Sequence, residues 1–89
     1  MKQVRISAIS SFYSVEETVD EKKSVEKLKL IRKCYLKQLE MKILEITPLF
    51  IPKHIDHPSV IDFKQAEHKA KKEFMLDEKN HLKVTTEVI

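Results

Sequence analysis

The sequence contains no glycine and no tryptophan, and it has one cysteine among its 89 residues. Without glycine there is no phosphate-binding loop, dinucleotide-binding fingerprint or nucleophile elbow, because these motifs need glycine where the backbone turns sharply or approaches a ligand. The single cysteine, Cys34, excludes an intramolecular disulfide and favours a reducing, cytoplasmic compartment. Several large enzyme classes are therefore excluded by composition.

Long apolar runs are also missing. No stretch of about 18 apolar residues is present, so we expect no membrane span and no membrane partner. The first five residues lack the apolar segment of a secretory signal, so we expect none. A chain of 89 residues predicts one small domain over residues 1–89, with a thin core that a second chain would stabilise.

Arginine is scarce although the chain is basic. Seventeen basic residues face fourteen acidic ones, and only Arg5 and Arg32 are arginines. Arginine is the usual bidentate reader of phosphates and guanine edges, whereas lysine binds phosphate as a point charge. This composition is typical of small accessory proteins of phages, plasmids and AT-rich bacteria, and it leaves non-specific nucleic-acid binding open.

Hydrophobic periodicity predicts two helices and two strands. Val4, Ile6 and Ala8 alternate with polar residues, which predicts a strand over residues 3–10. Residues 11–19 either prolong this strand or enter the following helix. A long helix is expected from about Asp20 to Ile46, ending where Thr47 precedes a proline.

In the second half of the chain a helix precedes the strand. Residues 49–58 contain two prolines and predict an ordered connector. Ser59 and Asp62 have capping-box spacing and predict the start of a second helix that ends near Leu76. Its apolar stripe is Val60, Phe63, Ala66, Ala70 and Phe74. A polar turn at 77–80 and an alternating strand over 81–89 follow.

We therefore predict an α+β fold. Its two helices, one of them long, form an antiparallel pair, and the N- and C-terminal strands either pair together or complete a sheet across a dimer. An all-α helical hairpin is the structural alternative. Two strands alone make a marginal sheet, which favours a homodimer.

The long helix carries apolar residues on two opposite sides. The wider arc is the expected core face, and it consists of Val25, Leu28, Ile31, Tyr35, Leu36, Leu39, Ile43 and Ile46. The second arc has heptad-like spacing and consists of Leu30, Cys34, Lys37, Met41 and Leu44. One short helix covers one side only, so the terminal strands, a second copy or another protein must cover the other. These five residues are the predicted partner-binding site.

Candidate chemistry is sparse. His54, Asp56 and His57 have ligand-forming side chains, but their place between prolines favours exposed or turn-stabilising residues, so we predict no metal and no cofactor. Cys34 lies mid-helix far from any histidine in the sequence, which favours a small apolar residue over a nucleophile. We accordingly predict no catalytic residues, no small-molecule substrate and no enzymatic activity.

Two functions remain after these exclusions. The first is a non-enzymatic interaction module, a regulator, inhibitor or assembly factor, that binds itself or another protein through the second arc. The alternative is a nucleic-acid-binding accessory protein that uses a lysine-rich side of the second helix, formed by Lys64, His68, Lys71 and Lys72.

Overall fold

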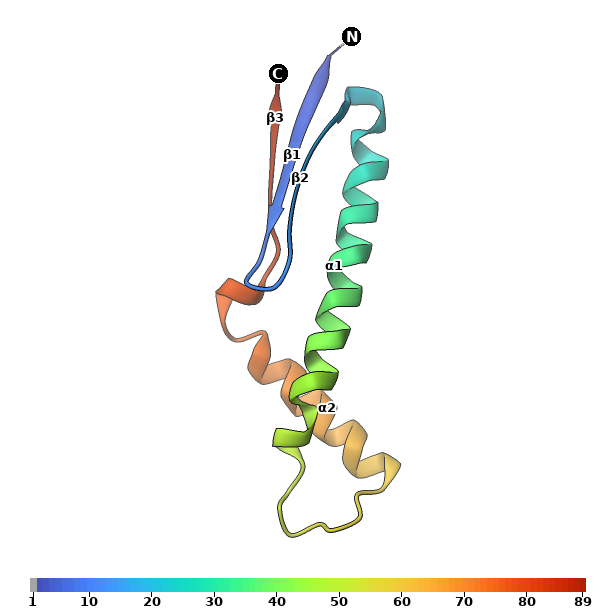
Figure 1. Cartoon of the computed structure of the whole chain (residues 1–89), viewed down its shortest axis with the longest axis vertical. Helices are drawn as coiled ribbons and strands as arrows, with labels where there is room; N and C mark the ends of the chain where they lie inside the picture. Colours follow the sequence, from blue (N-terminus) through green and yellow to red (C-terminus); the bar gives the residue numbers. More distant parts are fainter. Residues whose placement is uncertain (1) are drawn as a thin grey trace.

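The computed structural model describes residues 2–89 and has α+β architecture. Strands β1 (Gln3–Ile9) and β2 (Ser14–Asp20) form a hairpin, and helix α1 (Ser24–Ile46) follows. Helix α2 (Val60–Phe74) and strand β3 (Lys83–Val88) complete the chain. The three strands form an antiparallel sheet in the order β2-β1-β3, with α1 running alongside it (Figure 1).

Strand β1 is the centre of this sheet and pairs with β2 on one side and β3 on the other. Val4, Ile6 and Ala8 are buried, as their period-two spacing predicts. Opposite residues of antiparallel strands share a face, so Val4 lies between Val19 of β2 and Val88 of β3. The sequence thus correctly predicts both terminal strands, and they pair with each other within one chain.

The second strand corrects the expectation for residues 11–19. They neither prolong β1 nor enter the helix, because the chain reverses at residues 10–13 and returns as β2. Helix α1 consequently begins later than expected, at Ser24, after a short 3-10 turn over Glu21–Lys23 that Asp20 caps. The sheet therefore has three strands instead of the expected two.

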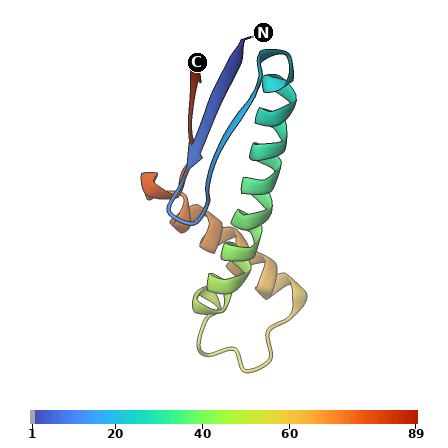
Figure 2. The ribbon, with the colours of Figure 1, turned by 45° about the horizontal axis from the view of Figure 1, so that its top comes forward.

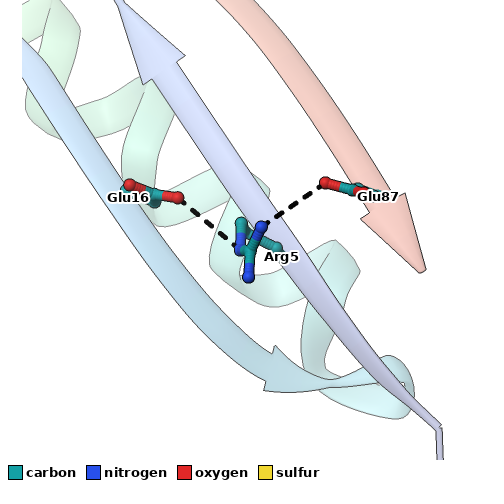
Figure 3. A network of polar contacts seen from close by, with 3 residues as sticks. All are labelled: Arg5, Glu16 and Glu87. Carbon is teal, nitrogen blue, oxygen red and sulfur yellow. Dashed lines mark ion pairs between the residues drawn. The ribbon is translucent and has the colours of Figure 1, made fainter. Parts of the chain in front are cut away.

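Helix α1 packs on β1 and β2. Its buried residue Ile31 contacts the cluster formed by Val4, Ile6 and Ala8. Lys27 of α1 forms an ion pair with Glu17 of β2, on the face of the sheet that the helix covers. On the opposite face Arg5 bridges Glu16 and Glu87 at 3.6 Å each, which links the two outer strands across β1 (Figure 3).

The buried residues of α1 are spaced every fourth position. They are Ile31, Tyr35, Leu39 and Ile43. The predicted core face is wrong at two of its residues, because Val25 is 62% exposed and Leu36 is 54% exposed. Neither the sheet nor α2 is broad enough to reach the helix at these two positions.

Helix α2 begins as the sequence predicts. Ser59 and Asp62 form a reciprocal capping box, and the helix then crosses the C-terminal half of α1 (Figure 1). Ala66 and Ala70 are buried, and Ala70 lies in the cluster of Tyr35, Leu39 and Ile43. The predicted stripe is wrong at Val60, which is 73% exposed because it precedes the crossing.

The molecule is long and thin, measuring 61 × 21 × 13 Å. The sheet and the first half of α1 occupy one end, and α2 with the proline-containing connector occupies the other (Figure 2). Neither helix of residues 2–89 combines the length and apolarity that crossing a bilayer requires.

Candidate interaction surfaces

The first candidate surface is the side of α1 turned away from its core contacts. We call it the α1 strip, and it consists of Leu30, Cys34, Lys37, Met41 and Leu44. At 100° per residue these positions lie opposite the buried residues of the helix. Leu30, Met41 and Leu44 are 50%, 62% and 52% exposed, and Cys34 and Lys37 are exposed as well. No other element of the described chain covers the strip.

Basic side chains follow one border of the α1 strip. Lys29 and Lys33 are exposed and lie beside Lys37 on the helix surface. Within residues 2–89 none of these three lysines forms an ion pair. Exposed Glu26 and Glu40 are acidic residues in the same sector of the helix. The strip thus combines an apolar centre with an edge on which three lysines outnumber two glutamates, and these acids dilute the positive potential.

Cys34 is a free, exposed thiol within the strip. The pKa of Tyr13 is raised first by burial and then by its electrostatic interaction with Cys34. The thiol lies in the middle of the strip, between Leu30 and Met41 along the helix.

The second candidate surface is a groove between α1 and α2 with a cavity volume of about 610 Å³. Its apolar floor comes from α1, through Leu36, Leu39 and Ile43. Its polar walls come from both helices and consist of Glu40, Lys64, Glu67, His68 and Lys71. The groove exists because α2 approaches α1 closely at its two buried alanines and diverges on either side of them.

The groove brings together three of the four residues predicted for nucleic-acid binding. Lys64, His68 and Lys71 line it, whereas Lys72 is exposed elsewhere on α2. Lys64 and His68 also line a neighbouring hollow of about 370 Å³ with Ile61, Gln65 and Lys69. Because Glu40 and Glu67 share the groove, its potential is less positive than the sequence of α2 alone suggests.

The connector between the two helices carries two histidines and an aspartate. His54, Asp56 and His57 are all exposed. Among residues 2–89 no group of three or more His, Cys, Asp or Glu side chains is placed to hold a metal ion. The pKa of Asp62 is lowered mainly by its hydrogen bonds from the Ser59 backbone and hydroxyl, with a smaller effect from His54.

The sequence reasoning missed the groove. Leu36, which the sequence places in the core, lines the groove instead, and Glu40 is not among the predicted site residues. The available signal was the narrowness of the α2 stripe, whose alanines at 66 and 70 fill less space than leucines. A helix that contacts its neighbour through alanines leaves uncovered surface beside the contact.

Comparison of the chain with protein-family models, with curated proteins and with solved structures finds no significant match. The function is therefore argued from the geometry of these two surfaces.

Proposed function

We propose that the protein is a non-enzymatic interaction module, a regulator, inhibitor or assembly factor, that binds a partner protein through the α1 strip and works as a homodimer in the cytoplasm. The observation that carries this proposal is the exposure of Leu30, Met41 and Leu44 on a helix whose other side is already packed. Large apolar side chains gathered along one helix face are typical of protein-binding surfaces.

The chemistry of the strip indicates the kind of partner. Its 4-3-4-3 spacing matches the seam along which two helices pack. Lys37 interrupts the seam, and Lys33 and Lys29 border it. The best fit is an amphipathic helix with an apolar stripe and acidic residues along its edge, because those acids would pair with the lysines.

The test uses Cys34 as an attachment point. A photo-crosslinker on this thiol should capture a partner in native cells, whereas the same probe on a Cys34→Ser, Lys53→Cys variant should not, since Lys53 is exposed in the connector. The captured protein is then purified and its affinity measured. Leu30→Ala with Met41→Ala should weaken binding about 100-fold, as expected for two truncated apolar anchors. Unchanged affinity would contradict the proposal.

A second candidate function rests on the α2 side of the groove. Lys64, His68 and Lys71 face one hollow, which favours a phosphate-bearing ligand such as a nucleic acid. The affinity for a short DNA duplex should then fall steeply with salt. Reversing the charges of Lys71 and Lys72 should abolish that binding and leave partner capture at Cys34 unchanged. Binding that is insensitive to salt would exclude this candidate.

A further inference from the structure

We infer that the free edge of β3 joins a second copy of this chain, β3 against β3, in an antiparallel register centred on Thr85. This inference rests on the proposed function because it takes the protein to be a homodimer. It adds that the edge of the sheet forms the dimer interface, which leaves the α1 strip free to bind the partner protein.

The free edge of β3 presents its hydrogen-bonding groups at even-numbered residues. Strand β3 pairs with β1 on one side only, and it forms one border of the sheet (Figure 1). The backbone N–H of Ile89 donates to the carbonyl of Gln3 at 2.9 Å, so odd-numbered residues of β3 bond to β1. The N–H and C=O groups of Val84, Thr86 and Val88 therefore point away from the sheet, as a template for another strand.

Charge complementarity selects the register. When two β3 strands run antiparallel about Thr85, Val84 of each copy bonds to Thr86 of the other, so the outward-pointing groups meet. The same register places Lys83 opposite Glu87 of the second copy, twice by symmetry, so that each Glu87 lies between this lysine and Arg5 of its own chain. These are non-hydrogen-bonded positions, where cross-strand side chains lie closest. A shift by two residues in either direction loses both ion pairs.

The side chains on the helix-facing side of β3 agree with this pairing. Val88 is 64% exposed and Thr86 is exposed, because α1 covers β1 and β2 instead. In the dimer Val88 lies opposite Leu82 of the second copy, and Thr86 lies opposite Val84. Apolar residues left open in one chain thus gain neighbours in the continuous six-stranded sheet.

The other edge of the sheet is unsuited to self-pairing. Strand β2 carries Glu16, Glu17 and Asp20 and contains no basic residue. Its central antiparallel self-pairings set Glu16 opposite itself, Glu17 opposite itself, or Glu16 opposite Asp20, and each of these is repulsive. The two edges therefore differ: one repels its own copy and the other attracts it.

Charge reversal at the two β3 positions tests the register. The full chain is compared by sedimentation velocity at micromolar concentration, where the wild type should sediment at about twice 10.5 kDa. Lys83→Glu alone and Glu87→Lys alone should each weaken association about tenfold, because attraction becomes repulsion twice. Mixing the two variants should restore a dimer, since each acid then faces a base. Lys29→Glu, the same change on α1, should leave the dimer intact.

A backbone variant supplies an independent test. Thr86→Pro removes an outward N–H that β1 does not use, so it should abolish the dimer while circular dichroism shows a folded chain. Failure of the mixed variants to dimerise, or a dimer that survives Thr86→Pro, would overturn the inference. So would a wild type that is monomeric, or one that forms larger open-ended species.

The failure of this inference and the failure of the proposed function are distinguishable. A dimer that is lost only in Leu30→Glu with Met41→Glu would place self-association on the α1 strip and overturn the β3 pairing. A monomeric wild type that still binds a partner helix through Cys34 and its neighbours would also overturn it, while the proposed partner binding would stand.

Discussion

The hydroxyl of Tyr35 donates a buried hydrogen bond of 2.6 Å to the backbone carbonyl of Asn80. The Asn80 side chain also bonds in two directions. It accepts from the Ser11 hydroxyl at the β1–β2 turn, and its amide donates to the carbonyl of Phe74 at 2.7 Å. Asn80 thus joins the hairpin, the middle of α1 and the end of α2 just before β3 begins, so it fixes where β3 meets the sheet.

Asn80→Ala should destabilise the protein by about 2 kcal/mol, because it removes two part-buried side-chain hydrogen bonds, to the Ser11 hydroxyl and the Phe74 carbonyl. The free energy of unfolding is measured by urea denaturation. Lys79→Ala is the matched control at the exposed neighbouring position and should change it by less than about 0.5 kcal/mol. Equal effects of the two variants would contradict the role assigned to Asn80.

Alkaline pH should destabilise the fold through its two tyrosines. Burial raises the pKa of Tyr35, and burial followed by Cys34 raises that of Tyr13. The folded state therefore holds these protons more tightly than the unfolded state. Their contribution to stability is complete below the ordinary tyrosine pKa and is lost as the pH rises through the raised values. The chain has no tryptophan, so ultraviolet absorbance reports both groups directly.

The absorbance titration should show both tyrosinates forming at higher pH in the folded chain than in denaturant. Tyr35→Phe should remove part of the alkaline loss of stability. Titration of both groups at the same pH in the folded and the unfolded chain would refute this account of their burial.

Loss of the capping box should lower the stability of α2, which forms one wall of the groove. Ser59→Ala removes the acceptor for the Asp62 N–H and should cost about 1 kcal/mol of stability. Ser14→Ala, at an exposed position of β2, serves as the control. If both substitutions lower the midpoint of urea unfolding equally, the cap is not what stabilises α2.

The same cap predicts an acid response. Hydrogen bonds from Ser59 lower the pKa of Asp62, so its contribution to stability is present above the unfolded value and is lost as the pH falls through the folded value. In Ser59→Ala the Asp62 pKa, followed by NMR, should move up toward its ordinary value. A pKa that stays low in the variant would assign the shift to a different group.

Truncating the buried side chain of Ile6 beneath α1 should lower the free energy of unfolding far more than a truncation on the α1 strip. Ile6 is fully buried, and Ile6→Ala should destabilise the chain by about 2–5 kcal/mol. Met41→Ala, on the exposed strip, should cost less than about 1 kcal/mol in the free chain. Comparable losses in urea denaturation would mean that the strip is part of the core.

The strongly periodic parts of the fold were predictable from the sequence, and the long-range pairings were not. The alternation of Val4, Ile6 and Ala8 and the stop at Thr47 are local signals, and both are confirmed. Strand β2 was missed because Glu17 interrupts the apolar face between Val15 and Val19. That charge is accommodated by Lys27, a partner that the sequence pattern of β2 does not reveal.

The candidate site divides in the same way. The exposure of the α1 strip was predictable from the sequence, because α1 is apolar on two opposite sides and one short second helix can cover only one of them. The groove beside it depends on where α2 crosses α1, and crossing geometry is set by three-dimensional packing at Ala66 and Ala70. Asn80 was expected in a polar turn and is buried, because its side-chain amide bonds to the hairpin and to the end of α2 while its backbone carbonyl accepts from Tyr35 of α1.

The reactivity of Cys34 tests the central claim most directly, since this thiol lies in the middle of the α1 strip. A thiol reagent is added to the native chain above and below the concentration at which it dimerises, and the rate is compared with that in denaturant. An exposed strip predicts native rates within about tenfold of the unfolded rate at both concentrations. A thiol that reacts only when the chain unfolds, or only when the dimer dissociates, would contradict the claim that this surface is free to bind a partner.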